Sequence, residues 1–323
     1  MKKSKVFISL TGGLGNQLFQ LAAGLNLAKG SDLYLKISFG KPRKNNKGEI
    51  ELSSFTLPDN VFVENTDKAP YFIAKIAGYL LRVGVAPRFI EKYELISKVI
   101  VGLSNIPLSI YLKERVSVVY SKNLGYSRIN LKNKTNLVFG YFQTYYWVEN
   151  PNVKNIMMNL MLRENVQDLE LYKILADVEK PLIVHVRLGD YILEDNFGTL
   201  SEGYYRQSIE QILESGKCKS IWLFSDEIEK SEKLLPSDVN VPIRLFGDLN
   251  QSTAVTFQIM RLGHGYVIAN STFSWWAAYL AINQNVQIIC PKPWFKGMSE
   301  PIGLIPTNWH RIEGNIFTTT SLR

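Results

Sequence analysis

Cysteine and histidine are scarce in this sequence, and both shortages limit its chemistry. The 323 residues include two cysteines, Cys218 and Cys290, each at or just beyond the end of an apolar run. We expect two buried free thiols rather than a disulfide, which favours a reducing compartment. The three histidines, His185, His264 and His310, have no spacing typical of metal ligands. A disulfide framework and a histidine-based metal centre are therefore not expected.

Long uncharged apolar runs are also missing. The most apolar stretch, 72–90, is interrupted by Lys75, Arg82 and Arg88, whereas a membrane span needs about 18 or more apolar residues. The N-terminal MKKSKVFISL runs directly into a glycine turn, where a signal peptide would continue its apolar core. We expect a cytoplasmic protein, either soluble or bound peripherally at the inner face of the membrane.

Acidic residues are outnumbered by basic ones. The chain has 37 Lys and Arg against 29 Asp and Glu, a formal net charge of +8. Such a charge favours an anionic partner, and a nucleotide-sugar or an anionic membrane surface would suit it, as would solubility alone. RNA binding would need aromatic residues interleaved with basic ones, and this pattern is absent, so nucleic acid is not expected as a partner.

Short apolar runs alternate with amphipathic stretches, which predicts an α/β fold with doubly wound parallel sheets. The length favours two domains: an N-terminal α/β domain over 1–165 and a C-terminal Rossmann-type domain over 166–300. A tail over 301–323 is expected to pack back on the body. The clearest candidate linker is 163–180. Ligands of such sheets bind beyond the carboxyl ends of the strands, which is where the following motifs lie.

The first motif is TGGLGNQLFQ, residues 11–20, directly after the first predicted strand. It lacks the third glycine of the dinucleotide fingerprint. A structural turn explains the glycines, and the start of the following helix favours anions. The amides of Asn16 and Gln17, beside Gly15, are candidates for binding sugar hydroxyls or phosphate.

The second motif is HVRLGDY, which closes the strand predicted over 182–187. Period-two alternation places His185 and Arg187 on one face of that strand. The planar fork of arginine suits phosphate oxygens. Asp190 is expected either to orient Arg187 or to act as a base. A buried structural Arg–Asp pair with a hydrogen-bonded histidine is the alternative interpretation.

Two further motifs follow strand ends in the second half. Ser225 and Asp226 belong to FSDE, which fits either a nucleotide-contacting turn or a helix cap. The stretch ANSTFSWW places Asn270, Ser271, Thr272 and Phe273 at a helix start. There the backbone N–H groups and hydroxyls form a phosphate site or a simple cap, and the aromatic residues beyond form a core face. No Asp-x-Asp is present, so no metal ion is expected beneath a pyrophosphate.

Together these stretches resemble glycosyltransferase family 11, the α1,2-fucosyltransferases, especially the bacterial members. The matching segments, in order, are GGLGNQLFQLAAGLNLA, GYFQTYYW, HVRLGDY, YYRQSI, FSDE and ANSTFSWWAAYL, spread from about residue 8 to residue 295. Single motifs of this kind occur by chance, but their joint order is specific.

The resemblance implies a GT-B-like arrangement, with two Rossmann-type domains facing across a cleft and GDP-fucose held mainly by the C-terminal one. It implies metal-independent transfer of fucose with inversion to a hydroxyl of a glycan acceptor, galactose O2 in this family. It also implies Arg187 at the donor pyrophosphate, Ser271, Thr272 and Phe273 against the phosphates, and Asn16 reaching the donor from the other domain.

One position departs from the family pattern. A second arginine usually follows the first, and here that position is Leu188. A weaker donor site, or another cation in its place, is the expected consequence. The base that deprotonates the acceptor is open among Asp190, Glu194 and Asp195.

A predicted helix over 71–85 has a basic face with Lys75 and Arg82, followed by another helix over 88–103. Such a helix fits either plain solvation or a peripheral membrane contact, as would suit a lipid-linked oligosaccharide acceptor. Two other functions stay open: a transferase for another nucleotide-activated sugar, and a non-catalytic nucleotide or glycan binder.

Overall fold

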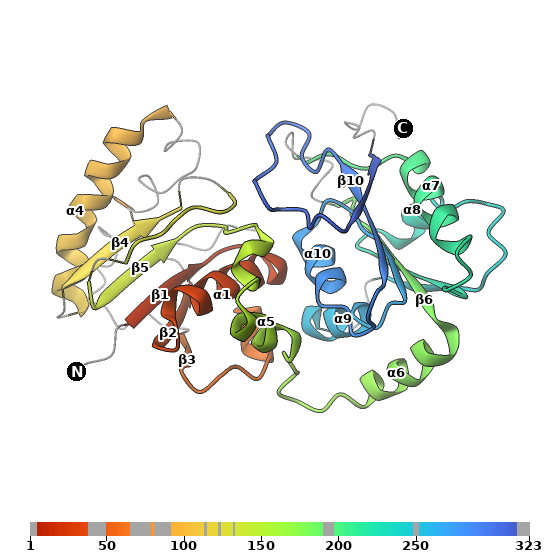
Figure 1. The fold of residues 1–323 in the computed structure, drawn as a ribbon, viewed down its shortest axis with the longest axis horizontal. Coiled ribbons are helices and arrows are strands. Elements are labelled where there is room, and N and C mark those ends of the chain that lie inside the picture. Colours follow the sequence, from red (N-terminus) through yellow and green to blue (C-terminus); the bar gives the residue numbers. More distant parts are fainter. Residues whose placement is uncertain are drawn as a thin grey trace. The chain divides into compact units, whose positions relative to one another are not determined.

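The computed structural model describes residues 5–37, 50–64, 79–80, 92–112, 115–121, 124–131, 133–189, 197–247 and 252–314. The chain divides into two compact units. The first comprises Met1–Arg163 with Pro301–Ile305, and the second comprises Glu164–Glu300 with Pro306–Arg323. Figure 1 shows the elements of each unit. The segment Pro301–Ile305 thus returns to the first unit before the chain ends in the second.

The first unit contains a five-stranded sheet in the order β3-β2-β1-β5-β4. Every neighbouring pair in it is parallel. The strands are β1 Lys5–Leu10, β2 Asp32–Ile37, β3 Val61–Glu64, β4 Val116–Tyr120 and β5 Thr135–Phe139. The central strand β1 is buried along nearly its whole length, as expected for a parallel sheet covered by helices.

The helices of the first unit are α1 Leu14–Ala28, η1 Glu51–Ser54, α4 Glu94–Leu112, η2 Tyr145–Val148 and α5 Pro151–Met158. Helix α1 buries Leu18, Leu21 and Leu25 on one face, the spacing that an amphipathic helix needs. It ends at Lys29, whose φ of 49° lies in the left-handed region, a common way to terminate a helix.

The second unit contains a six-stranded parallel sheet in the order β11-β10-β9-β6-β7-β8. Its strands are β6 Pro181–Val186, β7 Ser220–Ser225, β8 Ile243–Phe246, β9 Gly265–Val267, β10 Gln287–Lys292 and β11 His310–Glu313. The order reverses at β6, because β7 lies on one side of it and β9 on the other. Such a reversal opens a crevice beyond the strand ends.

The helices of the second unit are α6 Gln167–Glu179, α7 Glu202–Leu213, α8 Ile228–Glu232, α9 Thr253–Met260 and α10 Thr272–Tyr279. Serine side chains at Ser201, Ser252 and Ser271 cap α7, α9 and α10 by accepting backbone N–H groups. These caps satisfy donors that have no partner within the helix. They explain why each helix begins where it does.

The α/β class is confirmed, and so is the succession of two Rossmann-type parallel sheets that a GT-B-like protein requires. Both cysteines are buried and free, as expected. Burial raises the pKa of Cys218 to about 11 and that of Cys290 to about 12. Within the described part of the chain, no helix is long and apolar enough to cross a membrane.

Two local predictions are wrong. Helix α6 occupies most of the expected linker 163–180, because Tyr172 packs its ring against Trp222 and Phe246 of the sheet. The helix expected to end at residue 103 continues to Leu112. Its extension is held by Leu108, which is buried against strands β4 and β5, so packing overrides the local sequence signal. The helix predicted over 71–85 falls almost wholly outside the described residues.

Candidate functional site

Three adjacent strands of the second unit end in polar residues at one edge of the sheet. Strand β6 carries His185 and leads into Arg187, β7 ends at Ser225, and β9 leads toward the cap of α10 at Ser271. Since β9, β6 and β7 are neighbours and parallel, their carboxyl ends meet at the same edge. The structure therefore brings together the second, third and fourth sequence motifs.

The charged centre of this edge is an ion pair between Arg187 and Asp226. Their closest atoms, Nη1 and Oδ2, are 3.3 Å apart, and the other carboxylate oxygen accepts the backbone N–H of Leu188 at 3.0 Å. About a third of the Arg187 side chain, 35%, stays exposed. A Cβ at Gly189 would lie 2.4 Å from the Asp226 carboxylate, so a larger residue there would displace that carboxylate. Asp226 thus holds both the side chain of Arg187 and the turn that follows it.

The expectation that Asp190 orients Arg187 cannot be followed in the structure, because Asp190, Glu194 and Asp195 lie outside the described residues. For Asp226 the sequence allows either a nucleotide-contacting turn or a helix cap, and it does not predict the pairing with Arg187. No local pattern signals this pair, since the two residues are far apart in sequence and meet only when β6 and β7 align.

Leu188 does not face the same way as Arg187. Its side chain is buried and belongs to the apolar cluster between the sheet and α7, together with Val186, Tyr204 and Tyr205. Successive residues of an extended chain point to opposite sides. The residue found where the family pattern has a second arginine therefore serves the core in this protein.

His185 is buried on β6, two residues before Arg187. Its ring lies 6.2 Å from the Phe273 ring, and among the described residues its Nδ1 atom has no hydrogen-bond partner. Burial, with a smaller effect of the Arg187 charge, lowers the pKa of His185 to about 3. The imidazole is therefore neutral near neutral pH, and its catalytic role stays a prediction.

Ser225 uses its hydroxyl within the turn after β7. The hydroxyl lies 2.6 Å from that of Ser231 and accepts the N–H of Glu227 at 3.0 Å. The serine therefore shapes the turn that presents Asp226. Its expected contact with the donor stays a prediction.

The third strand end leads into α10. Ser271 accepts the N–H of Phe273 at 3.3 Å, and Asn270 donates to the carbonyl of Phe197 at 3.1 Å. Thr272 and Phe273 are half-buried, whereas Trp276 is fully buried, as the predicted core face requires. The start of α10 thus presents a helix N-terminus next to the strand that carries Arg187, an arrangement that favours anions.

The glycine turn of the first unit is built around Asn16. Gly12 has a φ of 77°, and a Cβ there would lie 2.4 Å from the Asn16 amide nitrogen. The side-chain amide oxygen of Asn16 accepts a hydrogen bond from the side-chain amide of Gln143 at 3.1 Å. Gly15 lies inside the first turn of α1 and is buried. Gln143 was not predicted as a site residue, although it belongs to the GYFQTYYW stretch that carries the family resemblance.

The N-terminus of α1 is already occupied by a carboxylate. Glu51, from η1, accepts the N–H of Leu14 at 3.1 Å. A second anion at this helix end would meet the charge of Glu51 at close range. The expectation of an anion site at α1 is therefore weakened by a residue that sequence reasoning missed, and Asn16 is better placed for a neutral group such as a sugar hydroxyl.

Gln20 connects the glycine turn to strand β5. Its side chain accepts the N–H of Thr11 at 3.0 Å and donates to the Thr11 hydroxyl at 2.9 Å and to the carbonyl of Gly140 at 3.0 Å. The residue is fully buried. It fixes the turn that positions Asn16.

The described part of the chain holds no group of three or more His, Cys, Asp or Glu side chains placed to bind a metal ion. His185 lies on β6 and His310 on β11, while His264 precedes β9. Arg187, paired with Asp226, is the cationic side chain of the strand-end cluster described above.

One family model matches nearly the whole chain. The model for Glycosyl transferase family 11 matches residues 5–309. The O-antigen biosynthesis glycosyltransferase WbnK of Escherichia coli is 26% identical over 306 residues, covering 90% of this chain and 95% of WbnK. An alpha-1,2-colitosyltransferase of Escherichia coli is 28% identical over 327 residues, which cover 96% of this chain and 99% of the colitosyltransferase. The solved fucosyltransferase NodZ from Bradyrhizobium has 13% identity and a TM-score of 0.44. The match covers 87% of this chain and 94% of NodZ.

Proposed function

Because the chain belongs to glycosyl transferase family 11, we propose that it transfers L-fucose from GDP-fucose to a hydroxyl of a glycan, galactose O2 being the expected position. The transfer proceeds with inversion and without a metal ion. In this proposal the second unit binds the donor and the first unit binds the acceptor.

The observation that carries the proposal is the joint placement of Arg187 and the α10 N-terminus at neighbouring strand ends. A leaving nucleoside diphosphate gains negative charge as its bond to the sugar breaks. Fixed positive groups stabilise that charge without reorganising during the reaction. Arginine and a helix N-terminus are two such groups, and Asp226 fixes the arginine in advance.

The reaction is a single displacement. The acceptor oxygen attacks the anomeric carbon from the face opposite the phosphate, the carbon–oxygen bond to the β-phosphate breaks, and GDP departs with the electron pair. A carboxylate takes the acceptor proton. The candidates remain Asp190, Glu194 and Asp195. A role of Asn16 at the donor is likewise a proposal.

The lack of any Asp-x-Asp sequence supports a site that works without a divalent cation. In place of a cation such as Mg²⁺, Arg187 provides positive charge that faces the negatively charged pyrophosphate. The backbone N–H groups at the start of α10 add to it. His185, being neutral and buried, acts behind Arg187 rather than on the substrate.

A second donor is favoured by a specific observation, the similarity to an alpha-1,2-colitosyltransferase. Colitose is L-fucose without one ring hydroxyl. A site that hydrogen-bonds this hydroxyl discriminates strongly against the sugar that lacks it, whereas an apolar site discriminates weakly. Transfer of colitose from its GDP derivative is therefore the alternative activity.

The proposed acceptor is a growing surface glycan, supported by the O-antigen biosynthesis role in the name of one relative. A lipid-linked oligosaccharide at the cytoplasmic face of the membrane suits this proposal. It also suits a chain with a net charge of +8 near an anionic surface.

The test measures sugar transfer from GDP-fucose and from GDP-colitose to galactose-terminated acceptors, with and without EDTA. We expect product with the wild type and a loss of about a hundredfold or more with Arg187→Ala. Arg206→Ala is the matched control, because Arg206 makes only ion pairs with surface carboxylates among its recorded contacts.

Three outcomes would count against the proposal. Product that disappears in EDTA would contradict the metal-free mechanism. Product from GDP-colitose but not from GDP-fucose would mean that the donor is GDP-colitose rather than GDP-fucose. GDP-sugar binding by calorimetry without turnover on any acceptor would indicate a non-catalytic binder.

A further inference from the structure

The outward face of α4 is more apolar than its inward face. Its exposed aliphatic side chains recur at spacings of three and four residues, and each is between 51% and 63% exposed. They are Ile96, Val99, Leu103, Ile106 and Ile110. Leu95, also exposed, extends this row at its N-terminal end. We call these six residues the α4 stripe.

The inward face of α4 accounts for its contact with the fold. Leu108 packs against Phe7 and Val116 of the sheet, Val101 is buried, and Ser97 and Ser104 are buried with them. The orientation of the helix is therefore settled by this inner face. The α4 stripe points away from the sheet, and none of its residues belongs to the buried core among the described residues of the first unit.

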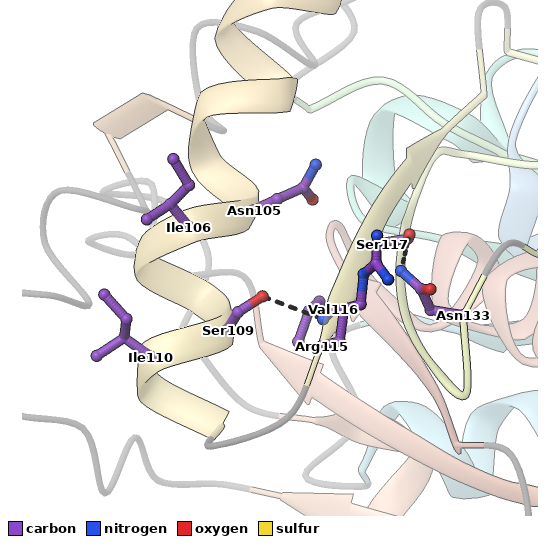
Figure 2. Close-up of a pocket in the computed structure, with 8 residues that line it drawn as sticks. All are labelled: Asn105, Ile106, Ser109, Ile110, Arg115, Val116, Ser117 and Asn133. Carbon is purple, nitrogen blue, oxygen red and sulfur yellow. Dashed lines mark hydrogen bonds between the residues drawn. The ribbon is translucent and has the colours of Figure 1, made fainter.

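Figure 2 shows the C-terminal half of the stripe. Ile106 and Ile110 project from α4 on the side away from β4, whereas Ser109 reaches toward β4 and accepts the N–H of Val116 at 3.1 Å. The two isoleucines also line a hollow of about 440 Å³ together with Arg115, whose side chain is exposed. Arg115 lies beside β4 (Figure 2), so a cation is present at this end of α4, next to the hollow that the isoleucines line.

The charges around the stripe are mainly positive. From Lys92 to Arg115 the sequence has four basic and two acidic residues. Glu94 is already paired with Lys98 at 3.0 Å. Tyr93, which is 42% exposed, lies beside Lys92 at the start of the helix. Exposed aliphatic residues flanked by cations and a tyrosine are the composition of a helix that lies on an anionic bilayer.

A second exposed aliphatic row has the opposite charge. On α6, Leu171, Ile174 and Val178 are exposed, but the helix carries four acidic residues and one lysine. An anionic surface would repel it. α4 therefore differs from α6 in the charge beside its exposed aliphatic residues, which is positive at α4 and negative at α6.

A second copy of the chain fits the α4 stripe less well. An antiparallel pair of α4 helices would bring the Lys92 end of one copy to the Arg115 end of the other. A parallel pair would align identical cations, so like charges would meet in either direction. A helix of 19 residues is also only about 28 Å long, and a stable dimer interface buries more than one such contact provides.

We propose that the α4 stripe docks the protein on the surface of an anionic phospholipid bilayer. The aliphatic side chains enter the boundary between headgroups and acyl chains, and Lys92 and Arg115 contact lipid phosphates. The helix lies in the plane of the surface, because its inner face stays packed on the sheet. This contact is separate from the sugar-transfer site and goes beyond the proposed function.

The test is co-sedimentation of the full chain with vesicles of phosphatidylglycerol and phosphatidylethanolamine, and with vesicles of phosphatidylcholine alone. We expect binding to the anionic vesicles that weakens as salt is raised. Ile106→Glu with Ile110→Glu should lower that partition coefficient by at least about tenfold. Ile174→Glu with Val178→Glu on α6, which also replaces two exposed aliphatic residues with glutamate, should leave it unchanged.

Arg115→Gln separates the charge from the apolar contact, and it should weaken anionic binding several-fold with a smaller salt dependence. Light scattering without lipid tests the second copy: a dimer that the α4 double variant dissociates would overturn the proposal. Failure of the wild type to bind anionic vesicles, or equal loss in both double variants, would overturn it as well. Transfer to a water-soluble acceptor without vesicles should be unaffected by the α4 changes, so this result stands apart from the proposed activity.

Discussion

The Arg187 guanidinium and the Asp226 carboxylate lie 3.3 Å apart at the ends of β6 and β7, and Asp226 also accepts the N–H of Leu188. One carboxylate therefore orients the cation and fixes the backbone of the turn after it. The two effects are separable by mutation, because an amide retains an acceptor oxygen but carries no charge.

Replacing Asp226 with asparagine should weaken donor binding more than it weakens the fold. The Leu188 N–H keeps an acceptor, but Arg187 loses the charge that orients it. We expect the GDP dissociation constant to rise by about tenfold, measured by calorimetry. Asp226→Ala removes the acceptor too, so it should lower the free energy of unfolding by a further ~1–3 kcal/mol. Equal GDP affinity in the wild type and Asp226→Asn would contradict a positioning role.

Restoring the family's second arginine should harm this protein. Leu188 is 4% exposed among aliphatic and tyrosine side chains, so Leu188→Arg buries an unpaired cation. We expect a loss of more than ~3 kcal/mol in the free energy of unfolding, measured by urea denaturation, and no gain in activity. Leu188→Met, close in volume, should cost less than ~1.5 kcal/mol. A stable and more active Leu188→Arg variant would show that this side chain turns toward the site.

Buried His185 should make the protein less stable in acid. Its pKa is about 3 in the folded chain against an ordinary value of 6.5. Between these pH values the unfolded chain binds a proton that the folded chain excludes. The free energy of unfolding therefore falls as the pH drops from 6.5 toward 3, by at most about 1.4 kcal/mol per pH unit from this group.

Urea unfolding at pH 7, 6 and 5 measures this slope. The His264 pKa is also lowered, mainly by burial, so the quantity to compare is the difference between wild type and His185→Phe. The variant should have a shallower slope than the wild type. Parallel slopes for the wild type and His185→Phe would contradict a neutral buried imidazole.

Gln20 should be needed for the stability of the glycine turn. Gln20→Glu leaves an acceptor for the Thr11 N–H but places a carboxylate against the Gly140 carbonyl in a fully buried position. We expect a loss of about 2–4 kcal/mol in the free energy of unfolding, measured by denaturation. A near-neutral Gln20→Glu would mean that the turn does not depend on this bond.

The alternation of strands and helices was determined by the sequence alone, as were the two parallel sheets that it implies. Both follow from local patterns: apolar runs, the glycine turn before α1, and serine caps before α7, α9 and α10. The motifs at the strand ends could also be located, since strand ends of a parallel sheet share one edge.

Tertiary structure alone decided which charges meet and which faces stay exposed. The pairing of Asp226 with Arg187 and the capping of Leu14 by Glu51 each join residues 37 or more positions apart, so no local pattern encodes them. Leu188 and Arg187 are neighbours with opposite surroundings. The residues of the α4 stripe have the composition of a core, and only the packing of Leu108 against the sheet turns them outward, because a helix can bury one face against one sheet.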